Sequence, residues 1–387
     1  MESSIETLLR EGCIKEVTEI PYCCNPLTVA EGKKLRLVLD LRHVNEYLDF
    51  PKFKYENLKV AAKHLQKDNY FCTFDLKSGY HHIDIHPDDQ KYLGFSWTFE
   101  DGTTRYFQFV VLPFGLASAC YVFTKVTKPL VKKWRKSGMR CTMYLDDGIC
   151  SAVTYGMASF HSGIIRNDLR NAGFTINHKK SMFEPSQLGK WLGFEIDTTK
   201  MMFFVPVEKI NALDNLINLV INLEFTNAKT VARIAGRLIS MSDGIGPLTR
   251  LFTRQMYRFI DERKGWYENR PVDNSLLSEF LFWNKNLRTL NGFHIKTNQA
   301  TSKVVYSDAS ETGYGGYVVQ KLGNVISRGD FKTSEKGSSS TYRELLAVKY
   351  ILQSVGSYLR NERVQWYSDN YNVSRIIEVG SKRSHLH

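Results

Sequence analysis

The sequence predicts an α+β protein built from more than one domain. Short strand-like runs alternate with amphipathic helices over residues 1–204. After Val205 the apolar periodicity becomes helical and continues to residue 292. A polar stretch at 293–302 is followed by a strand, a Gly-rich hairpin, a helix and a further strand within residues 303–387. We therefore expect a mixed domain, a helical domain, a linker and a final α/β domain.

Composition limits the functional class. The chain has 387 residues, enough for two or three domains with their own cores. Hydrophobic residues make up 43% and charged residues 24%, which is typical of a globular protein in water. The net charge of +12 favours a polyanionic partner, because basic side chains gain affinity by releasing counterions from phosphates. A basic protein without such a partner would have the same charge.

The cysteines and the N-terminus predict the cellular setting. The seven cysteines form no C-x-x-C pair, so neither a disulfide framework nor a zinc module is predicted. No apolar N-terminal segment has the form of a signal peptide, and no run reaches membrane-spanning length. We expect an intracellular protein, in the cytoplasm or nucleus, without a membrane partner.

Two adjacent acids, Asp146 and Asp147, stand between two apolar runs within residues 141–150. The pattern predicts a β-hairpin with Leu145-Asp146-Asp147-Gly148 at its tip. One or two carboxylates together with substrate phosphates form a normal Mg²⁺ site. Asp-Asp-Gly is also an ordinary hairpin turn, so the pair alone fits either interpretation.

A third acid, Asp75, ends an apolar run that begins at Tyr70. Two strands that each deliver an acid at adjacent ends would hold two divalent ions. Such a pair stabilises the attacking and leaving oxygens in phosphoryl transfer. Between these strands, a turn at 113–115 opens a predicted helix that runs from Ala117 to about Trp134.

Six segments of the chain resemble, in order, the motifs of reverse transcriptases. They are Lys34–Asn45, Phe74–Leu76, Leu112–Leu116, Tyr144–Asp147, Gly173–Lys180 and Trp191–Glu195. The resemblance implies a right-hand polymerase, with fingers and palm at 1–204 and a helical thumb at 205–292. The amino-acid sequence of residues 39–45 and 74–82 most resembles that of DIRS-like retrotransposons, which carry a tyrosine recombinase.

The resemblance implies a two-metal active site. Asp75 and Asp146 would bind two Mg²⁺ or Mn²⁺ ions, Leu76 would lend its backbone carbonyl, and Asp147 would lie nearby in support. The primer 3′-hydroxyl would attack the α-phosphate of a dNTP, and pyrophosphate would leave.

The resemblance also implies nucleotide contacts. Arg36 would contact the triphosphate, although a solvated hairpin with ordinary turn lysines at 33 and 34 is the alternative. Tyr80 would lie under the deoxyribose and exclude ribonucleotides, and a core tyrosine is the alternative. Phe114 replaces the Gln of retroviral enzymes, as in retrotransposon enzymes, and Gly115 would allow close approach to the base pair.

The remaining palm residues have implied roles at the leaving group and the primer. Lys180, with Lys179 adjacent, would protonate or neutralise the departing pyrophosphate. Leu192 and Gly193 fall in the segment similar to the primer grip. Three histidines nearby are expected to be structural, because no cysteine or fourth ligand lies near them in the sequence. They are His81, His82 and His86.

The predicted thumb is basic. Its helices are expected around Ile210–Val220, from a Thr226 N-cap to near Gly244, and onward from Pro247. Three arginines recur every four residues and are expected on one helix face. They are Arg250, Arg254 and Arg258. The face would suit a duplex backbone, and a solvated charged face is the alternative.

Residues 303–387 resemble an RNase H domain, with Asp308, Glu344 and Asp369 at the positions of its metal-binding carboxylates. Two divalent ions there would activate water and stabilise the leaving oxygen. The family's domain continues with a last strand, a helix and a fourth ligand, whereas this sequence stops at His387. We therefore expect an incomplete domain whose RNase H activity is in question, from a longer polyprotein or a truncated element.

The sequence thus predicts an RNA-directed DNA polymerase of a retrotransposon, acting on an RNA or DNA template with a DNA primer. Two alternatives remain open. One is a decayed or domesticated element that binds nucleic acid without catalysis. The other is a DNA-templated repair polymerase with the same palm.

Overall fold

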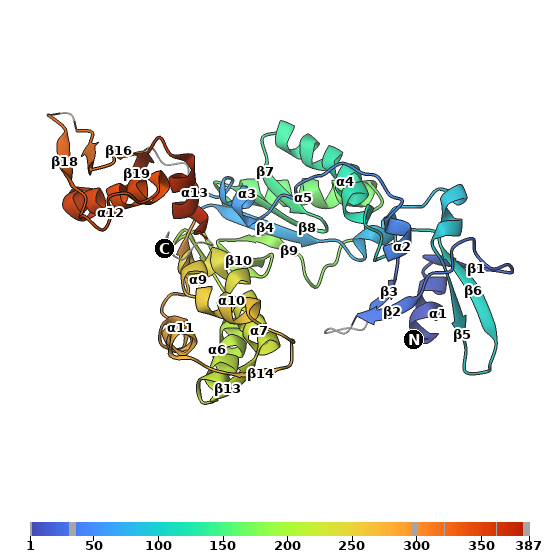
Figure 1. The fold of residues 1–387 in the computed structure, drawn as a ribbon. Helices are drawn as coiled ribbons and strands as arrows, with labels where there is room; N and C mark the ends of the chain where they lie inside the picture. Colours follow the sequence, from blue (N-terminus) through green and yellow to red (C-terminus); the bar gives the residue numbers. More distant parts are fainter. Residues whose placement is uncertain (1, 31–35, 296–300, 321, 361, 382–387) are drawn as a thin grey trace. The chain divides into compact units, whose positions relative to one another are not determined.

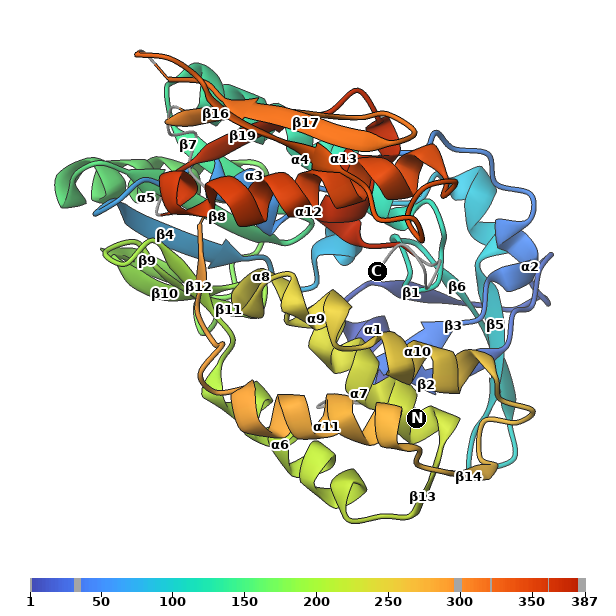
Figure 2. The ribbon, with the colours of Figure 1, turned by 60° about the vertical axis from the view of Figure 1, so that its left-hand side comes forward.

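A computed structural model describes residues 2–30, 36–295, 301–320, 322–360 and 362–381 (Figures 1 and 2). The chain divides into two compact units. The first contains Met1–Phe203 and His294–Lys296, and the second contains Phe204–Phe293 and Thr297–His387. Both units contain helices and strands, which confirms the α+β class.

The centre of the first unit is an antiparallel sheet in the order β7-β8-β4-β9. Its strands are β4 (Tyr70–Asp75), β7 (Arg140–Tyr144), β8 (Asp147–Ala152) and β9 (Met182–Ser186). Helices α4 (Ala119–Lys136) and α5 (Tyr155–Asn171) cover one face of this sheet (Figure 1). Phe74, Trp134 and Ile165 are fully buried between the helices and the sheet. The acids that end β4 and begin β8 therefore stand on a rigid support.

A second part of this unit carries the N-terminal segment. Its elements are α1 (Glu2–Arg10), β1 (Ile14–Val17), β2 (Leu27–Ala30), β3 (Arg36–Leu39), α2 (Arg42–Asn45), η2 (Pro87–Tyr92), β5 (Gly94–Thr98) and β6 (Thr104–Phe109). The strands form a β1-β6-β5 sheet and a β2-β3 hairpin. Phe95 and Phe107 stack at 5.2 Å in their shared core. Lys33 and Lys34 lie outside the described residues.

Two short elements connect these sheets, and a further sheet follows them. The connecting elements are α3 (Leu58–Ala62) and η1 (Gly79–His82). The sheet has the order β10-β11-β12-β15, with β10 (Leu188–Trp191), β11 (Phe194–Asp197), β12 (Met202–Phe204) and β15 (Phe293–His294).

The second unit begins with a group of helices. They are α6 (Val207–Ile221), α7 (Ala228–Ser240), α8 (Ser242–Ile245), α9 (Leu248–Leu251), α10 (Arg254–Asp261) and α11 (Asn274–Asn286), with a small β13 (Phe225–Asn227) and β14 (Asn269–Pro271) pair. The N-cap of α7 is Asn227, whose side chain accepts from the backbone of Thr230 at 3.0 Å. The sequence had predicted Thr226, which lies in β13 instead.

The basic stripe predicted here is interrupted. Arg250 lies in α9, whereas Arg254 and Arg258 lie in α10, and residues 252–253 separate the two helices. The Thr253 side chain hydrogen-bonds back to the carbonyl of Thr249 at 2.8 Å within this break. The expectation that three arginines share one helix face is therefore wrong.

The remainder of the second unit is a four-stranded sheet in the order β18-β17-β16-β19, with a long helix against it. Its elements are β16 (Lys303–Ala309), β17 (Gly313–Val318), β18 (Val325–Asp330), α12 (Ser340–Leu359), β19 (Val364–Tyr367) and α13 (Tyr371–Val379). Strands β16 and β19 run parallel, and the other pairs are antiparallel. Val305, Val318 and Ile351 are fully buried in the core that α12 forms with the sheet.

Candidate functional site

The acidic residues of the first unit converge where β4 and β8 pair. Asp75 is the direct antiparallel partner of Asp147. Tyr144 pairs with Asp147 across the β7–β8 hairpin, so Asp146 lies in a two-residue loop after Leu145, whose φ is +51°. The structure thus brings together the three acids that the sequence singled out.

The hairpin tip is shorter than predicted. Asp147 and Gly148 belong to β8 and not to the turn. Gly148 is required for packing, because an added Cβ would lie 2.0 Å from the ring of Phe74. The absent side chain lets β8 lie directly over Phe74, which fixes the register between the two acid-bearing strands.

Asp75 is held by several neighbours and is only 5% exposed. Its Oδ1 accepts from the Asn177 amide at 2.7 Å, and its Oδ2 lies 3.2 Å from Lys180 Nζ. The Leu76 backbone N–H donates to the Asp146 carbonyl at 3.0 Å, which ties the two acidic segments together. Asn177 was not identified from the sequence, although it lies inside the segment 173–180 that carried Lys180.

The electrostatics of the cluster favour a divalent cation. Burial raises the pKa of Asp147 to about 7, and the nearby charges of Asp146 and Asp75 raise it in the same direction. A cation among these carboxylates would remove their mutual repulsion. Carboxylate and carbonyl oxygens are the ligands that Mg²⁺ and Mn²⁺ prefer. The residues therefore fit such an ion, with Lys180 beside them as a fixed positive charge.

A cavity of about 430 Å³ extends from the acids to a second hairpin. Asp75, Asp147 and Lys180 line one side, and Leu192 and Gly193 line the other. Leu192 and Gly193 form the two-residue loop between β10 and β11, with φ of +46° and +78°. Such left-handed pairs match the twist of a tight hairpin. The residues similar to a primer grip thus share one cavity with the acids.

Tyr80 lies in η1, close behind Asp75 in the chain. The centroid of its ring lies 5.4 Å from that of Phe114 and 5.5 Å from that of Phe123. Its hydroxyl lies 2.8 Å from Cys120 Sγ. A Cβ added to the preceding Gly79 would lie 3.3 Å from Asp146. The Tyr80 ring therefore lies next to the acidic loop. Its predicted role in excluding ribonucleotides stays a prediction.

Gly115 lies against β3, the strand that Arg36 begins. Gly115 has a φ of +109°, and an added Cβ would lie 2.2 Å from the Leu39 carbonyl. The glycine is thus required for approach to β3, and its predicted contact with a base pair stays a prediction. Arg36 begins β3 and pairs with Ala30. The Arg36 side chain is not among the described features, so its triphosphate contact stays a prediction as well.

A second acidic cluster lies in the final sheet. The carboxylates of Asp308, Glu344 and Asp369 approach within 4.8 Å of one another. Because β16 and β19 are parallel, Asp308 near the end of β16 and Asp369 just after β19 lie at the same edge of the sheet, and α12 adds Glu344. Glu344 is 3% exposed and accepts from the Ala309 backbone at 3.1 Å. Burial raises the pKa of Glu344, as do Asp369 and Asp308, so this oxygen-donor cluster also fits a divalent cation.

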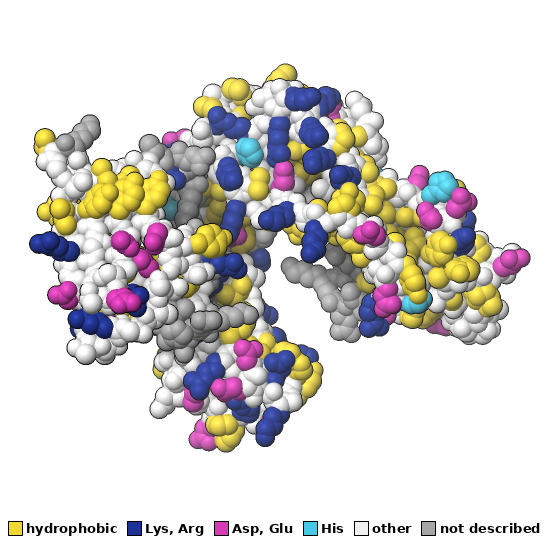
Figure 3. Space-filling view, turned by 45° about the horizontal axis from the view of Figure 1, so that its top comes forward, with side chains coloured by type: hydrophobic (Ala, Val, Ile, Leu, Met, Phe, Trp, Pro, Cys, Tyr) yellow, Lys and Arg dark blue, Asp and Glu magenta, His cyan; other side chains and the backbone are white. Residues whose placement is uncertain are grey.

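A basic stripe that the sequence analysis did not single out runs along α4. The helix contains six Lys/Arg and no acidic residue. Lys133 pairs with Asp168 at 2.7 Å, and Arg135 pairs with Glu56 at 2.7 Å. Four exposed lysines recur every three or four residues, which places them on one helix face. They are Lys125, Lys128, Lys132 and Lys136. Figure 3 shows that basic side chains also gather on the face of the molecule drawn there, in the upper part of the view.

Comparisons with known proteins show what the chain is similar to. Residues 30–196 match the family described as reverse transcriptase (RNA-dependent DNA polymerase). The chain is 24% identical over 368 residues to the genome polyprotein of Petunia vein clearing virus (isolate Shepherd), covering 90% of this chain. It is 25% identical over 393 residues to the Pol polyprotein from transposon gypsy of Drosophila melanogaster, covering 94% of this chain. This chain spans only 15% and 35% of those two polyproteins.

Solved structures share the fold. The foamy viral protease-reverse transcriptase in complex with double-stranded DNA superposes with a TM-score of 0.67 at 18% identity, over 97% of this chain and 63% of that one. Its complex with an RNA/DNA hybrid gives a TM-score of 0.65 at 18% identity, over 96% of this chain and 53% of that one.

The fold is therefore that of the right-hand polymerases, as the sequence predicted. Residues 30–196, which hold the first acidic cluster, are similar to the reverse transcriptase family, and over most of its length the chain is similar to polyproteins of a virus and a transposon. The expected similarity to DIRS-like elements stays a prediction, because the relatives described above belong to other groups.

Proposed function

We propose that this chain is an RNA-directed DNA polymerase, which adds nucleotides from dNTPs to a primer 3′-hydroxyl on an RNA or DNA template. The observation that carries the proposal is the antiparallel pairing of Asp75 with Asp147, with Asp146 in the adjoining loop. Asp75 ends β4 and Asp147 begins β8, so the relative positions of these two acids are set by the sheet register.

The protein's own groups have distinct roles in this proposal. Asp75, Asp146 and the Leu76 carbonyl would hold two Mg²⁺ or Mn²⁺ ions, with Asp147 in support. Bound ions of this kind neutralise phosphate charge and lower the pKa of a coordinated hydroxyl. Asn177 orients Asp75 through its 2.7 Å hydrogen bond. Lys180 Nζ, with a side chain 66% exposed, provides positive charge for a departing pyrophosphate.

The partner surfaces support the same proposal. Leu192 and Gly193 would hold the primer strand across the cavity from the acids. The α4 lysines provide positive charge that suits a phosphate backbone. The foamy viral enzyme was solved with DNA and with an RNA/DNA hybrid, and the relatives are polyproteins. We infer a template–primer duplex as partner and a polyprotein as the source of the chain. Among the described residues no helix is long and apolar enough to cross a bilayer.

Primer extension tests the proposal. The wild-type chain is incubated with a DNA primer on an RNA template, dNTPs and Mg²⁺, beside Asp146→Asn and the exposed control Asp89→Asn. We expect extension by the wild type and the control, and a loss of at least about 1000-fold in Asp146→Asn, equal to about 4 kcal/mol of activation free energy. Duplex binding should be retained by all three proteins. Extension by Asp146→Asn would refute the site.

The two alternative functions give different results in the same assay. A decayed element would bind the template–primer without extending it. A DNA-templated repair polymerase would extend the primer on a DNA template and not on the matched RNA template. The acids at all three positions of the cluster favour catalysis over decay.

We also propose an RNase H-like nuclease site in the second unit. The observation that favours it is the convergence of Asp308, Glu344 and Asp369 within 4.8 Å. The test is cleavage of the RNA strand of a labelled RNA/DNA hybrid, compared with Glu344→Gln and with Glu311→Gln, which changes an exposed acid outside the cluster. Cleavage by the wild type and by Glu311→Gln, without cleavage by Glu344→Gln, would support the site. Equal cleavage by all three would refute it.

A further inference from the structure

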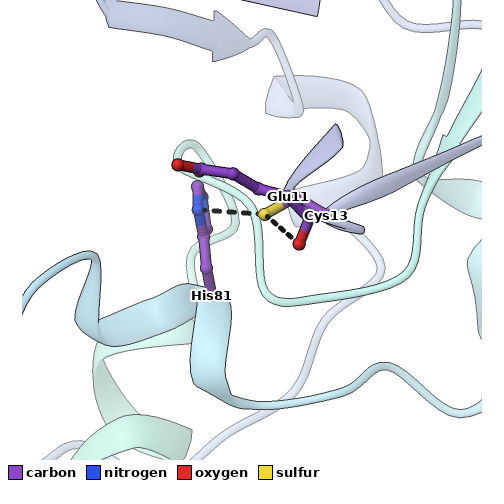
Figure 4. Close-up of side chains that lie close together, drawn as sticks. All are labelled: Glu11, Cys13 and His81. Carbon is purple, nitrogen blue, oxygen red and sulfur yellow. Dashed lines mark hydrogen bonds between the residues drawn. The ribbon is translucent and has the colours of Figure 1, made fainter. Parts of the chain in front are cut away.

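Three potential metal ligands meet at a place that neither acidic cluster uses. Figure 4 shows Glu11, Cys13 and His81 side by side. Glu11 and Cys13 lie in the turn between α1 and β1, and His81 lies in η1. Cys13 Sγ is 3.4 Å from His81 Nδ1, and one ligand atom from each residue lies within 4.8 Å of the others. No cysteine lies near His81 in the sequence, because Cys13 is 68 positions away.

The spacing of sulfur and nitrogen suits a zinc ion. Zn–S bonds of about 2.3 Å and Zn–N bonds of about 2.0–2.1 Å, at the tetrahedral angle, place the two ligand atoms about 3.6 Å apart. The observed 3.4 Å is close to this value. Glu11 is exposed, so its side chain can rotate to bring the carboxylate within bonding distance of an ion bound by Cys13 and His81. Cys13 Sγ also lies 3.9 Å from the backbone carbonyl of Glu11, and the Glu11 side chain adds a carboxylate beside the thiol and the imidazole.

The surroundings set the protonation state of the thiol and of the imidazole. Cys13 is 4% exposed, and the half-buried His81 ring packs against Phe114 at 5.7 Å. Burial raises the pKa of the Cys13 thiol to about 11, with Glu11 adding to the effect, and burial lowers the pKa of His81. The imidazole is therefore neutral and ready to bind a metal. The thiol would lose its proton to solvent as the Zn–S bond forms.

We propose that Glu11, Cys13 and His81 bind one Zn²⁺ ion, with a water molecule as the fourth ligand. The ion would join the start of β1 to η1 and so fix the short helix that carries Tyr80. The proposal is independent of the polymerase function, because it uses none of the carboxylates assigned to either acidic cluster.

Cobalt substitution tests the site on the full chain. The protein, reduced and freed of metal with a chelator, is titrated with Co²⁺ and observed by absorption spectroscopy. We expect a thiolate-to-cobalt charge-transfer band that saturates at one equivalent and disappears when Zn²⁺ is added. The acidic clusters contain no sulfur, so Co²⁺ bound there gives no such band.

Matched variants locate the signal. Cys13→Ser should abolish the band, and His81→Gln should weaken Co²⁺ binding at least tenfold. Cys24→Ser and His86→Gln, which change exposed residues of the same types, should match the wild type. Zn²⁺ should also raise the melting temperature of the wild type by more than that of His81→Gln, because that variant keeps both acidic clusters but loses one of the three proposed zinc ligands.

Two results would overturn the proposal. One is the absence of a thiolate band in the wild type, which would leave only a Cys–His hydrogen bond. The other is a band that persists in Cys13→Ser, which would assign it to another cysteine. If Cys13→Ser does not fold, His81→Gln decides in its place, because the half-buried imidazole is the less demanding change. Neither result bears on primer extension, so this proposal and the polymerase proposal fail separately.

Discussion

Asn177 donates a 2.7 Å hydrogen bond from its side-chain amide to Oδ1 of Asp75. Its backbone N–H also donates to the Asp75 carbonyl at 2.8 Å. One residue therefore holds both the main chain and the carboxylate of a proposed metal ligand, and it does so from the segment that follows α5.

The first prediction concerns this positioning residue. Asn177→Ala should lower kcat/KM for primer extension about tenfold, equal to about 1.4 kcal/mol, because Asp75 loses its orienting donor. Asn177→Asp should lower it further, because a fourth carboxylate adds repulsion. Steady-state single-nucleotide incorporation measures both, with the exposed Asn171→Ala as control. Wild-type rates in both variants would remove Asn177 from the site, and a shift of the Mg²⁺ requirement would distinguish positioning from misfolding.

The second prediction concerns sugar selection. Tyr80→Ala should admit ribonucleotides and lower dNTP-over-rNTP selectivity by at least about tenfold, because the ring beside Phe114 is removed. Tyr80→Phe keeps the ring and loses only the hydroxyl near Cys120. It should therefore keep the selectivity of the wild type. Competitive incorporation assays give the ratio, and an unchanged ratio in Tyr80→Ala would exclude the gate.

The third prediction tests the contact between β8 and β4. Gly148→Ala should destabilise the protein by about 1–3 kcal/mol, because its methyl group would enter the Phe74 ring. Gly163→Ala is the matched control, since Gly163 lies in α5 with open space around its Cβ position. That change should stabilise by about 0.5–1 kcal/mol. Urea unfolding measures both, and equal effects would contradict the packing argument.

The fourth prediction concerns pH. Burial raises the pKa of Asp168, but hydrogen bonds from Lys133 at 2.7 Å and Trp134 at 2.9 Å outweigh it, so the net pKa is lowered. A lowered folded-state pKa gives stability that is present above the unfolded value of about 3.9 and is lost as pH falls. Asp168→Ala should cost about 1–3 kcal/mol at neutral pH, because the buried Trp134 N–H loses its acceptor.

The same variant supplies its own check. The difference in unfolding free energy between wild type and Asp168→Ala should shrink as pH falls from about 5 to about 3. A difference that does not depend on pH would mean that the carboxylate contributes through packing alone. Lys133→Met, which removes the exposed partner and keeps the alkyl chain, should reproduce only part of the loss.

Local patterns in the sequence predicted the acidic cluster well. The strand register and the helix boundaries depend on contacts that these local patterns do not report. Strand ends at Asp75 and Asp147 follow from apolar runs that stop at acids. The register that pairs these residues depends on Gly148 packing against Phe74. The Asp-Asp-Gly sequence is typical of a turn, so the sequence predicted Gly148 at the hairpin tip and not in the strand. The break at residues 252–253 depends on side-chain bonding to the backbone, which helical periodicity does not report.

The neighbours of His81 were missed for the same reason. The Cys13–His81 contact joins two segments whose separation no local pattern encodes. Asn177 likewise had no signal of its own, because an asparagine after a strand-like run is also typical of a turn. The roles of Arg36, Lys180, Leu192 and Gly193 stay predictions.

The parallel pairing of β16 with β19 sets the order in which the second acidic cluster can form. Asp308 is synthesised early in its domain and Asp369 near its end, with a hairpin, a strand and α12 between them. Non-local parallel pairing is slow, because the intervening chain must be closed before the contact stabilises it. A nascent chain would therefore complete β16, β17 and β18 first, and the cluster of Asp308, Glu344 and Asp369 would form only after β19 had docked.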